Sequence, residues 1–403
     1  MFLHILIALI LGICCGIFTG ICPGIHINIV SVVLLNLSPI LLKYTNPLVL
    51  CTFIIAMAIT HTFLDTIPSI FLGAPDSENA LNVLPGHKML LEGKGFEAVK
   101  ITIIGSYFCL LLGLLMTPAL ILGAPKIALF LKPYIGYILL AVVVFMILKD
   151  KENQKKIWNL IIFLISGIFG ILVFSIPNFK DPLFPMLSGL FGISGLILSL
   201  SENTNIPPQT ETDSVRIPIK NQIKALVSGA FSGSLTGIFP GLGPAQAAII
   251  AMQLAGDIGM HAFMMLVGGI GTVASLFSLV TLYTLEKARD GAIVVVSKII
   301  GVLTIEKFGV LLATALIAGG IAVLLTMAFT RLFTRLISLV NYRYLSIGII
   351  IFVACLVFYF SSFLGLFILS ISTSIGLIAP LKKVGRNNAM GCLLLPVILY
   401  FLI

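Results

Sequence analysis

Stretches of about 20 apolar residues follow one another along almost the whole chain, and each is long enough to cross the hydrocarbon core of a bilayer as a helix. In lipid, backbone polar groups can be satisfied only within helices or a closed barrel. Hydrophobic residues make up 59% of the 403 residues and charged residues 10%, whereas soluble domains have about 45–50% and about 25%. The sequence therefore predicts an all-α protein that crosses the cytoplasmic membrane several times.

Two groups of apolar stretches flank a polar segment at 201–222. The first group comprises 2–22, 25–42, 47–72, 97–122, 126–149, 157–178 and 183–200, and the second comprises 223–240, 242–255, 261–285, 308–329, 345–362, 363–380 and 389–403. We expect a first transmembrane repeat over 1–200, a cytoplasmic linker over 201–222 and a second transmembrane repeat over 223–403. Polar stretches at 76–95 and 286–307 follow the third apolar stretch of each group.

A motif of 13 residues occurs once in each repeat. Residues 12–24 read GICCGIFTGICPG and residues 229–241 read GAFSGSLTGIFPG, with seven identical positions. In both copies glycine recurs every fourth residue, which favours close packing against another helix in lipid. Helix packing alone would explain this glycine ridge. The Pro-Gly pair that ends each copy is more specific, because proline lacks an N–H and clashes with the preceding turn, so the helix stops and restarts there.

Lysine and arginine concentrate on opposite sides of the two repeats. The loop at 149–156 carries four lysines, whereas the matching loop around Ser361 has no charge. Conversely, the second repeat is rich in basic residues at 331–343 and 382–386, where the first repeat has almost none. Because basic loops stay in the cytoplasm, the repeats must have opposite orientations. We predict two inverted-topology repeats, each with a Pro-Gly-broken re-entrant hairpin and about five transmembrane helices, as in many secondary transporters.

The two breaks predict a binding site for an anion between the repeats. Where each helix restarts, its free N–H groups carry partial positive charge and point into the break. The predicted substrate-binding residues are Thr19, Gly20, Pro23, Gly24, His26 and Asn28 in the first copy and Thr236, Gly237, Pro240, Gly241, Gly243 and Gln246 in the second. Two alternatives stay open: the threonines bond back to their own helices, and His26 is merely packed.

The third apolar stretch contains the polar segment ITHTFLDTIPS. His61 and Asp65 are four residues apart and share a helix face, with Thr62 and Thr66 beside them. An acid inside a membrane span is expensive and indicates function, so these four residues predict a site that couples a cation, Na+ or H+. The structural alternative is that Asp65 caps a break at Pro68 and pairs with His61. Hydroxyls without an acid occupy the matching place in the second repeat: Thr272, Ser275, Ser278 and Thr281.

Several other functions are not indicated. The seven cysteines lie in apolar stretches without CxxC or Cys/His spacing, so we expect no metal site and no cofactor. The net charge of +9 comes from loops beside apolar spans rather than from a basic face, which argues against nucleic acid. No HExxH or P-loop motif is present, which argues against an enzyme. The remaining histidines, His4, His87 and His261, are expected at the membrane interface.

The motifs are similar to those of the large permease of the tripartite tricarboxylate transporters. The resemblance lies in the two GxxTGxxPG repeats, in GAPDSENALNVLPGHKMLLEGKGFEA at 73–98 and in RNNAMGCLLLPVIL at 386–399, and it covers nearly the whole chain. Two features depart from the family pattern: Leu84-Pro85-Gly86 stands where Asp-Gly is usual, and the first motif continues with His26 and Asn28. The chain is also shorter than the usual large permease and looks closest to archaeal stand-alone members.

The resemblance implies cation-driven uptake of citrate-like carboxylates, with a small membrane subunit and an extracellular binding protein as partners. Distantly similar Pro-Gly repeats occur in polyprenyl-phosphate transporters, so a lipid phosphate is the main alternative substrate. A channel would need a continuous polar pore, and an intramembrane enzyme would need a nucleophile or substrate beside His61 and Asp65. The sequence leaves open whether the chain forms a homodimer.

Overall fold

The computed structural model describes residues 1–22, 27–73, 83–177, 179, 182–201, 207–211, 215–239, 242–337 and 342–403. This part of the chain is helical, without strands. Within it, seven helical segments are long and apolar enough to cross a membrane: Phe2–Ile21, Pro47–Phe71, Gly95–Leu131, Asn153–Phe174, Gly259–Leu285, Ile305–Ile337 and Arg343–Leu381. The prediction of an all-α, multi-pass membrane protein is confirmed.

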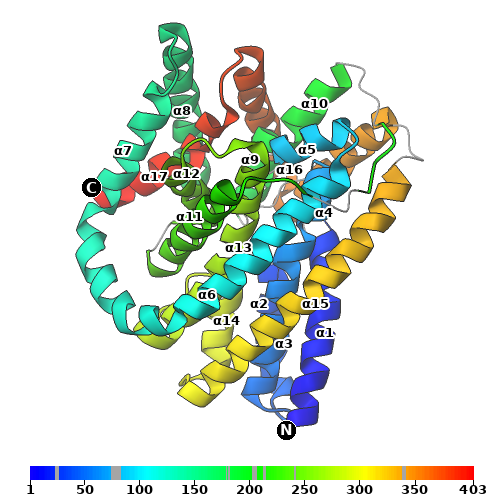
Figure 1. The fold of residues 1–403 in the computed structure, drawn as a ribbon, viewed down its shortest axis with the longest axis vertical. Helices are drawn as coiled ribbons and strands as arrows, with labels where there is room; N and C mark the ends of the chain where they lie inside the picture. Colours follow the sequence, from blue (N-terminus) through cyan, green and yellow to red (C-terminus); the bar gives the residue numbers. More distant parts are fainter. Residues whose placement is uncertain are drawn as a thin grey trace.

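The elements lie in the following order (Figure 1). The first half contains α1 (Phe2–Ile21), α2 (Ile27–Leu41), α3 (Pro47–Leu64), α4 (Thr66–Phe71), α5 (Val83–Leu91), α6 (Gly95–Leu131), η1 (Lys132–Tyr134), α7 (Ile135–Leu148), α8 (Asn153–Phe174), α9 (Leu183–Leu187), the π-helix η2 (Ser188–Ile193) and α10 (Ser194–Ser201). The second half contains α11 (Ile219–Ile238), α12 (Pro244–Ala255), α13 (Gly259–Leu285), α14 (Gly291–Ile300), α15 (Ile305–Ile337), α16 (Tyr342–Leu381), η3 (Arg386–Met390) and α17 (Gly391–Leu402).

Two almost fully buried helices, α3 and α13, form the centre of the molecule. They run in opposite directions, because the end of α4 lies beside the start of α13: a methyl group on Gly86 would stand 2.6 Å from Cγ1 of Ile70 and 3.3 Å from Cε of Met264. The two helices meet at Thr62 and Thr272, whose hydroxyl oxygens are 3.2 Å apart.

Each central helix is covered by one glycine-ridged helix from its own half and one long helix from the other half (Figure 1). Helix α1 packs along α3, and α11 packs along α13. A methyl group on Gly16 would lie 2.6 Å from Cβ of Thr60, and one on Gly233 would lie 2.9 Å from Cγ1 of Val273. Helix α6 packs on α13, while α15 packs on α3. The glycine ridges therefore serve close helix packing, as their spacing predicts.

Both glycine-ridged helices begin at the same end of the molecule as the central helix on which they lie. In the second half, Asn221 near the start of α11 donates to the carbonyl of Ile258, just before α13, with an N···O distance of 3.1 Å. Helix α12 packs back along α11 before α13 starts. In the first half, contacts of Gly12 with Phe53 and of Gly20 with Leu64 show that α1 runs parallel to α3.

Some predicted boundaries are wrong. Helix α6 continues to Leu131 through Pro118 and Pro125, where we expected two separate spans; neighbouring helices in membranes tolerate such prolines by satisfying the freed backbone groups. The polar stretches at 76–95 and 286–307 contain the helices α5 and α14. By contrast, the boundary expected at 362–363 is confirmed by Ser362, whose φ of 53° interrupts α16.

The break in the third span lies at Asp65 rather than at Pro68. Helix α3 ends at Leu64 and α4 begins at Thr66. Pro68 has no N–H to donate to the carbonyl four residues earlier, at Leu64, and its ring crowds that carbonyl. The interruption therefore appears one turn before the proline itself.

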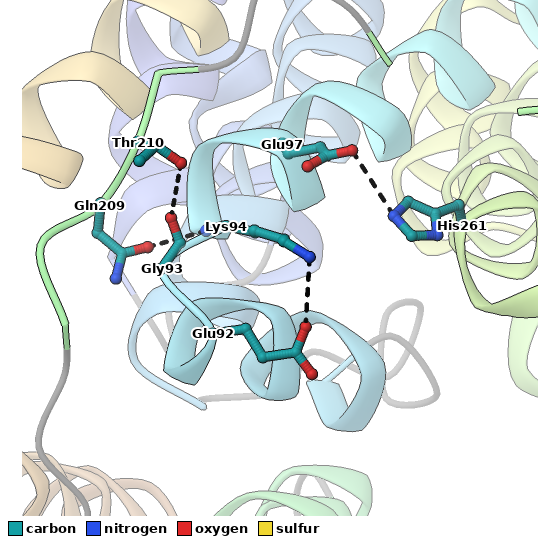
Figure 2. Close-up of polar contacts among 8 residues, drawn as sticks. Glu92, Gly93, Lys94, Glu97, Gln209, Thr210 and His261 are labelled. Atoms are coloured by element: carbon teal, nitrogen blue, oxygen red, sulfur yellow. Dashed lines mark hydrogen bonds and ion pairs between the residues drawn. The ribbon is translucent and has the colours of Figure 1, made fainter. Parts of the chain in front are cut away.

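The described part of the linker is fastened to both halves. Gln209 accepts from the N–H of Gly95 at 2.8 Å, and Thr210 donates to the carbonyl of Gly93 at 3.1 Å (Figure 2). Its neighbour Glu211 lies 3.7 Å from Arg331 and 3.9 Å from Arg335, near the end of α15. In Figure 1 the α7–α8 turn, the end of α15 and the end of α16 lie toward one end of the molecule, opposite the N-terminus.

Candidate functional site

Part of the predicted anion site lies outside the described residues. These positions are Pro23, Gly24, His26, Pro240 and Gly241, together with the side chain of Asn28. The flanking residues Thr19, Gly20, Thr236, Gly237, Gly243 and Gln246 are described, as are all four residues of the predicted cation site. The site can therefore be built from the helix ends that approach each break.

The end of α1 lies directly against the predicted cation site. Thr19 Oγ1 is 3.2 Å from Nδ1 of His61 and bonds back to the carbonyl of Gly16 at 3.3 Å. A methyl group on Gly20 would stand 2.8 Å from Cβ of Leu64 and 3.3 Å from the backbone nitrogen of Asp65. The structure thus brings the first predicted substrate-binding residues together with two of the predicted cation-coupling residues.

Asp65 lies at the junction of α3 and α4 and is 3% exposed. Its carbonyl accepts the hydroxyl of Ser69 at 2.8 Å. Thr62 and Thr66 are also buried, and each donates to a carbonyl three residues earlier in the helix. Carboxylate, hydroxyl and carbonyl oxygens are the ligands that hard cations prefer, and Asp65, Thr62 and Thr66 bring all three kinds to this helix junction.

The second break is approached by α11 and α12. Thr236 donates to the carbonyl of Gly233 at 2.7 Å, the back-bonding that was one alternative for this residue. Gly237 lies against the backbone of Phe277 on α13. Gln246 accepts the N–H of Gly243 at 3.0 Å, so its amide oxygen satisfies a donor at the start of α12.

The contact between Thr62 and Thr272 shows how far apart the two breaks lie along the axes of α3 and α13. Helix α1 ends beside Leu64, two residues beyond Thr62, and α11 ends beside Phe277, five residues beyond Thr272. Because α3 and α13 are antiparallel, the two offsets point in opposite directions along the helix axes. The ends of α1 and α11 are therefore about seven residues, or about 10 Å, apart along these axes, at 1.5 Å per residue. Both glycine-ridged helices therefore end close to the level at which α3 and α13 cross.

One acid near this region was missed by comparing the central helices alone. Ser275 on α13 donates to Oδ2 of Asp290 at 2.6 Å, and Ser278 accepts the backbone N–H groups of Arg289 and Asp290 at 2.9 and 2.8 Å. Asp290 also caps α14 through the N–H of Ala292 at 2.9 Å. The sequence pattern D-G-A could predict the cap, but not the contact with α13.

Two further observations concern acidic, cysteine and histidine side chains among the described residues. No group of three or more His, Cys, Asp or Glu side chains among the described residues is arranged to hold a metal ion. His261 lies 3.6 Å from Glu97 near the start of α13 and is partly exposed (Figure 2). His87, expected at the membrane interface, is instead buried, with Nδ1 3.2 Å from the carbonyl of Ile70.

Comparison with known proteins then decides the family. The model of the tripartite tricarboxylate transporter TctA family matches residues 6–391. The chain belongs to this family. TctA proteins are membrane transporters rather than enzymes, and they act in tripartite systems with a small membrane subunit and a binding protein.

One curated relative of this TctA protein is an uncharacterized protein of Methanocaldococcus jannaschii. It is 31% identical over 366 residues, which cover 87% of this chain and 88% of the relative. No solved structure matches the chain. The suspected resemblance to the large permease is therefore confirmed over almost its full length.

Proposed function

We propose that this TctA protein is a secondary-active transporter that moves a di- or tricarboxylate across the cytoplasmic membrane, coupled to a cation, by alternating access. The observation that carries the proposal is the antiparallel crossing of α3 and α13 at Thr62 and Thr272, with the glycine-ridged helices ending beside it. Transporters of this kind hold their substrate near the membrane midplane, at the interface of two repeats.

The proposal includes two inverted repeats, each with a re-entrant hairpin. Its support is the opposite direction of α3 and α13 and the reciprocal packing of α6 on α13 and α15 on α3. The basic segments at 149–156, 331–343 and 382–386 belong to the α7–α8 turn and the ends of α15 and α16. These parts lie toward one end of the molecule (Figure 1), as expected if that end faces the cytoplasm. The linker 201–222 would then be cytoplasmic, and the two hairpins would enter the membrane from opposite faces.

The anion would bind between the two breaks. The helices α2 and α12 begin just after them, and the N–H groups of a helix start favour negative charge. Thr19 and Thr236 stand one turn before the breaks, with hydroxyls that can turn from their own carbonyls to the substrate. This uses the residues predicted from the sequence, including Pro23, Gly24, His26, Asn28, Pro240 and Gly241, in the roles given to them there.

The coupling ion, Na+ or H+, would bind at Asp65 with His61, Thr62 and Thr66. Supporting this assignment, Asp65 is almost fully buried at a helix junction, where carbonyl groups are released from the helix ladder. The contact of Thr19 with His61 supports a cation site that would lie next to the first break. Cation binding and anion binding can then favour the same conformation, which is the requirement for coupled transport.

Transport by the reconstituted protein tests the proposal. We expect proteoliposomes to accumulate labelled citrate or a related carboxylate when a Na+ or proton gradient is imposed, and not without a gradient. Thr236→Val should reduce the affinity for the carboxylate. Because Thr236 bonds only within its own helix in the described structure, Thr314→Val in α15 is a matched control that removes a similar back-bonded hydroxyl away from the breaks.

Three results would contradict parts of this proposal. Uptake that ignores both gradients would favour a channel. Binding of a polyprenyl phosphate but of no carboxylate would favour the lipid-carrier alternative. Equal substrate affinity in Thr236→Val and in the wild type would remove the second break from the site. Dependence on an added small membrane subunit or binding protein would identify those proteins as partners of this chain.

A further inference from the structure

Arg386 carries a buried positive charge that the breaks and the α3–α13 crossing do not use. It begins η3, outside the seven candidate spans, and only 8% of the residue is exposed. Its Nη1 has no hydrogen-bond partner, and no ion pair of this residue is found in the part of the chain that the structure describes. Since arginine stays protonated in proteins, the group is a charge rather than a neutral donor.

A buried charge without a counter-charge is strongly unfavourable. Proteins bury arginine where it pairs with a carboxylate, a phosphate or another anion, because its planar group presents parallel N–H donors. An isolated guanidinium among the described residues therefore points to an anionic ligand for this group.

The described neighbours of Arg386 come from both halves, and those named here are not acidic. A methyl group on Gly195 of α10 would lie 3.4 Å from Nη1, so the glycine leaves the guanidinium beside bare backbone. His87 of α5 lies near enough to be affected: burial lowers the pKa of His87, and the charge of Arg386 lowers it further. Lys382 and Lys383 precede Arg386 in the chain and add positive potential on this side.

We propose that Arg386 is the main ligand of a second anion site, lined by η3, α10 and α5, which binds an oxyanion of the carboxylate or phosphate type. This site is distinct from the two breaks and stands whether or not the breaks bind a substrate. Two sources share this chemistry: a soluble carboxylate or phosphate, and the phosphate headgroup of a membrane lipid. The low exposure of Arg386 and the two neighbouring elements limit the ligand to a compact group.

Thermal unfolding of the full chain in a non-ionic detergent and a low-salt chloride buffer tests the site. The probes are citrate, inorganic phosphate and phosphatidylglycerol, the last compared with phosphatidylcholine. At least one of the three anionic probes should raise the Tm of the wild type by about 2 °C or more, because a ligand that binds only the folded state stabilises it. Arg386→Met should abolish that rise, whereas Lys151→Met, which removes an exposed cation from the α7–α8 turn, should keep it.

The variant protein also reports on the site without ligand. Because Arg386→Met removes an unpaired buried charge, its Tm in the absence of the probes should equal or exceed that of the wild type. A rise with citrate or phosphate identifies a soluble oxyanion, and a rise with phosphatidylglycerol alone identifies a lipid headgroup. The proposal is overturned by an equal rise in Arg386→Met, by no rise with any probe, or by a variant that fails to fold or unfolds earlier than the wild type.

Discussion

Ser278 on α13 occupies the position that Asp65 occupies on α3. In each half the third glycine of the ridge contacts the residue just before this position, Leu64 for Gly20 and Phe277 for Gly237. The acid of the second half comes instead from Asp290, which follows α13 and bonds to Ser275 on its side. The first half thus carries its acid, Asp65, at the end of the central helix itself. The second half has serine there, and its acid, Asp290, comes from outside the helix and bonds to Ser275.

This difference predicts separate effects for the two acids. Asp65→Asn should abolish the dependence of citrate uptake on the cation gradient, because the buried carboxylate that would bind the cation is lost. Asp290→Asn should leave the dependence intact and change stability little, because asparagine caps a helix about as well as aspartate and keeps the acceptor for the N–H of Ala292. Gradient-dependent uptake and Tm, measured for both variants, distinguish the roles. Loss of coupling in Asp290→Asn alone would assign the cation to the second half.

The glycine ridge predicts a strong and local effect of a single methyl group. Gly16→Ala would place Cβ 2.6 Å from Cβ of Thr60, so it should destabilise the protein by about 1–3 kcal/mol. Gly320→Ala in α15 is the matched control, because nothing lies within 4 Å of the new methyl group there. The control should stabilise by about 0.5–1 kcal/mol, since alanine favours the helix. Thermal unfolding in detergent measures both, and equal effects would contradict the close packing.

The threonine pair at the crossing predicts an energetic coupling between the halves. Thr62→Val and Thr272→Val each remove one hydroxyl of a pair whose oxygens are 3.2 Å apart. In a double-mutant cycle we expect a coupling of about 0.6 kcal/mol and no more than about 1.7 kcal/mol, the range measured for hydrogen bonds between membrane helices. Additive effects of the two substitutions on Tm would show that the hydroxyls do not interact in the folded protein.

The hydrogen bonds of the linker to the turn between α5 and α6 predict that the linker is protected from proteolysis. Gln209→Ala removes the acceptor of the Gly95 N–H and the donor to the carbonyl of Leu90, so the linker should detach from the turn between α5 and α6. Limited proteolysis should then cut the linker several times faster. Glu92→Gln, which removes only an ion pair between two half-exposed side chains (Figure 2), should leave the rate unchanged. Equal rates in both variants would contradict the docking.

The inverted arrangement predicts opposite accessibility of two equivalent positions. Tyr44 and Asp257 are exposed residues shortly before α3 and α13. In a background without other cysteines, Tyr44→Cys should react with a membrane-impermeant maleimide in intact cells, and Asp257→Cys only after permeabilisation. Labelling of both positions from the same side would show that the halves have the same orientation.

The sequence predicted those features that depend on local patterns. Apolar length gave the membrane class, the glycine spacing gave the packing of α1 and α11, and the pair Ser361–Ser362 marked the interruption of α16. It did not predict α5 and α14, because α5 is short and lies in a polar stretch, and α14, although apolar, has only 10 residues, too few to cross a membrane. The predicted boundary between the spans 97–122 and 126–149 is absent, because α6 continues to Leu131.

The candidate site was predicted only as far as residues near in sequence could indicate it. The motif identified Thr19 and the polar segment identified His61, but their contact depends on the register between α1 and α3. The sequence assigned neither Asp290 nor Arg386 to a site, because each lies in an ordinary polar segment. Only the folded chain shows what lies around them. Tertiary contacts, rather than residue types, separate these residues from ordinary surface charges.

The cover of α3 by α15 has a consequence for synthesis of the protein. The ribosome must add roughly 270 further residues after α3 before α15 is complete, which takes about 14–55 s at the usual rate of about 5–20 residues per second. During that time the side of α3 that packs against α15 in the folded protein has no partner helix. A chain truncated before α15 would leave the side of α3 that carries Ile59 and Phe63 without its partner helix, so quality-control proteases should remove it rather than let it persist as a shortened protein.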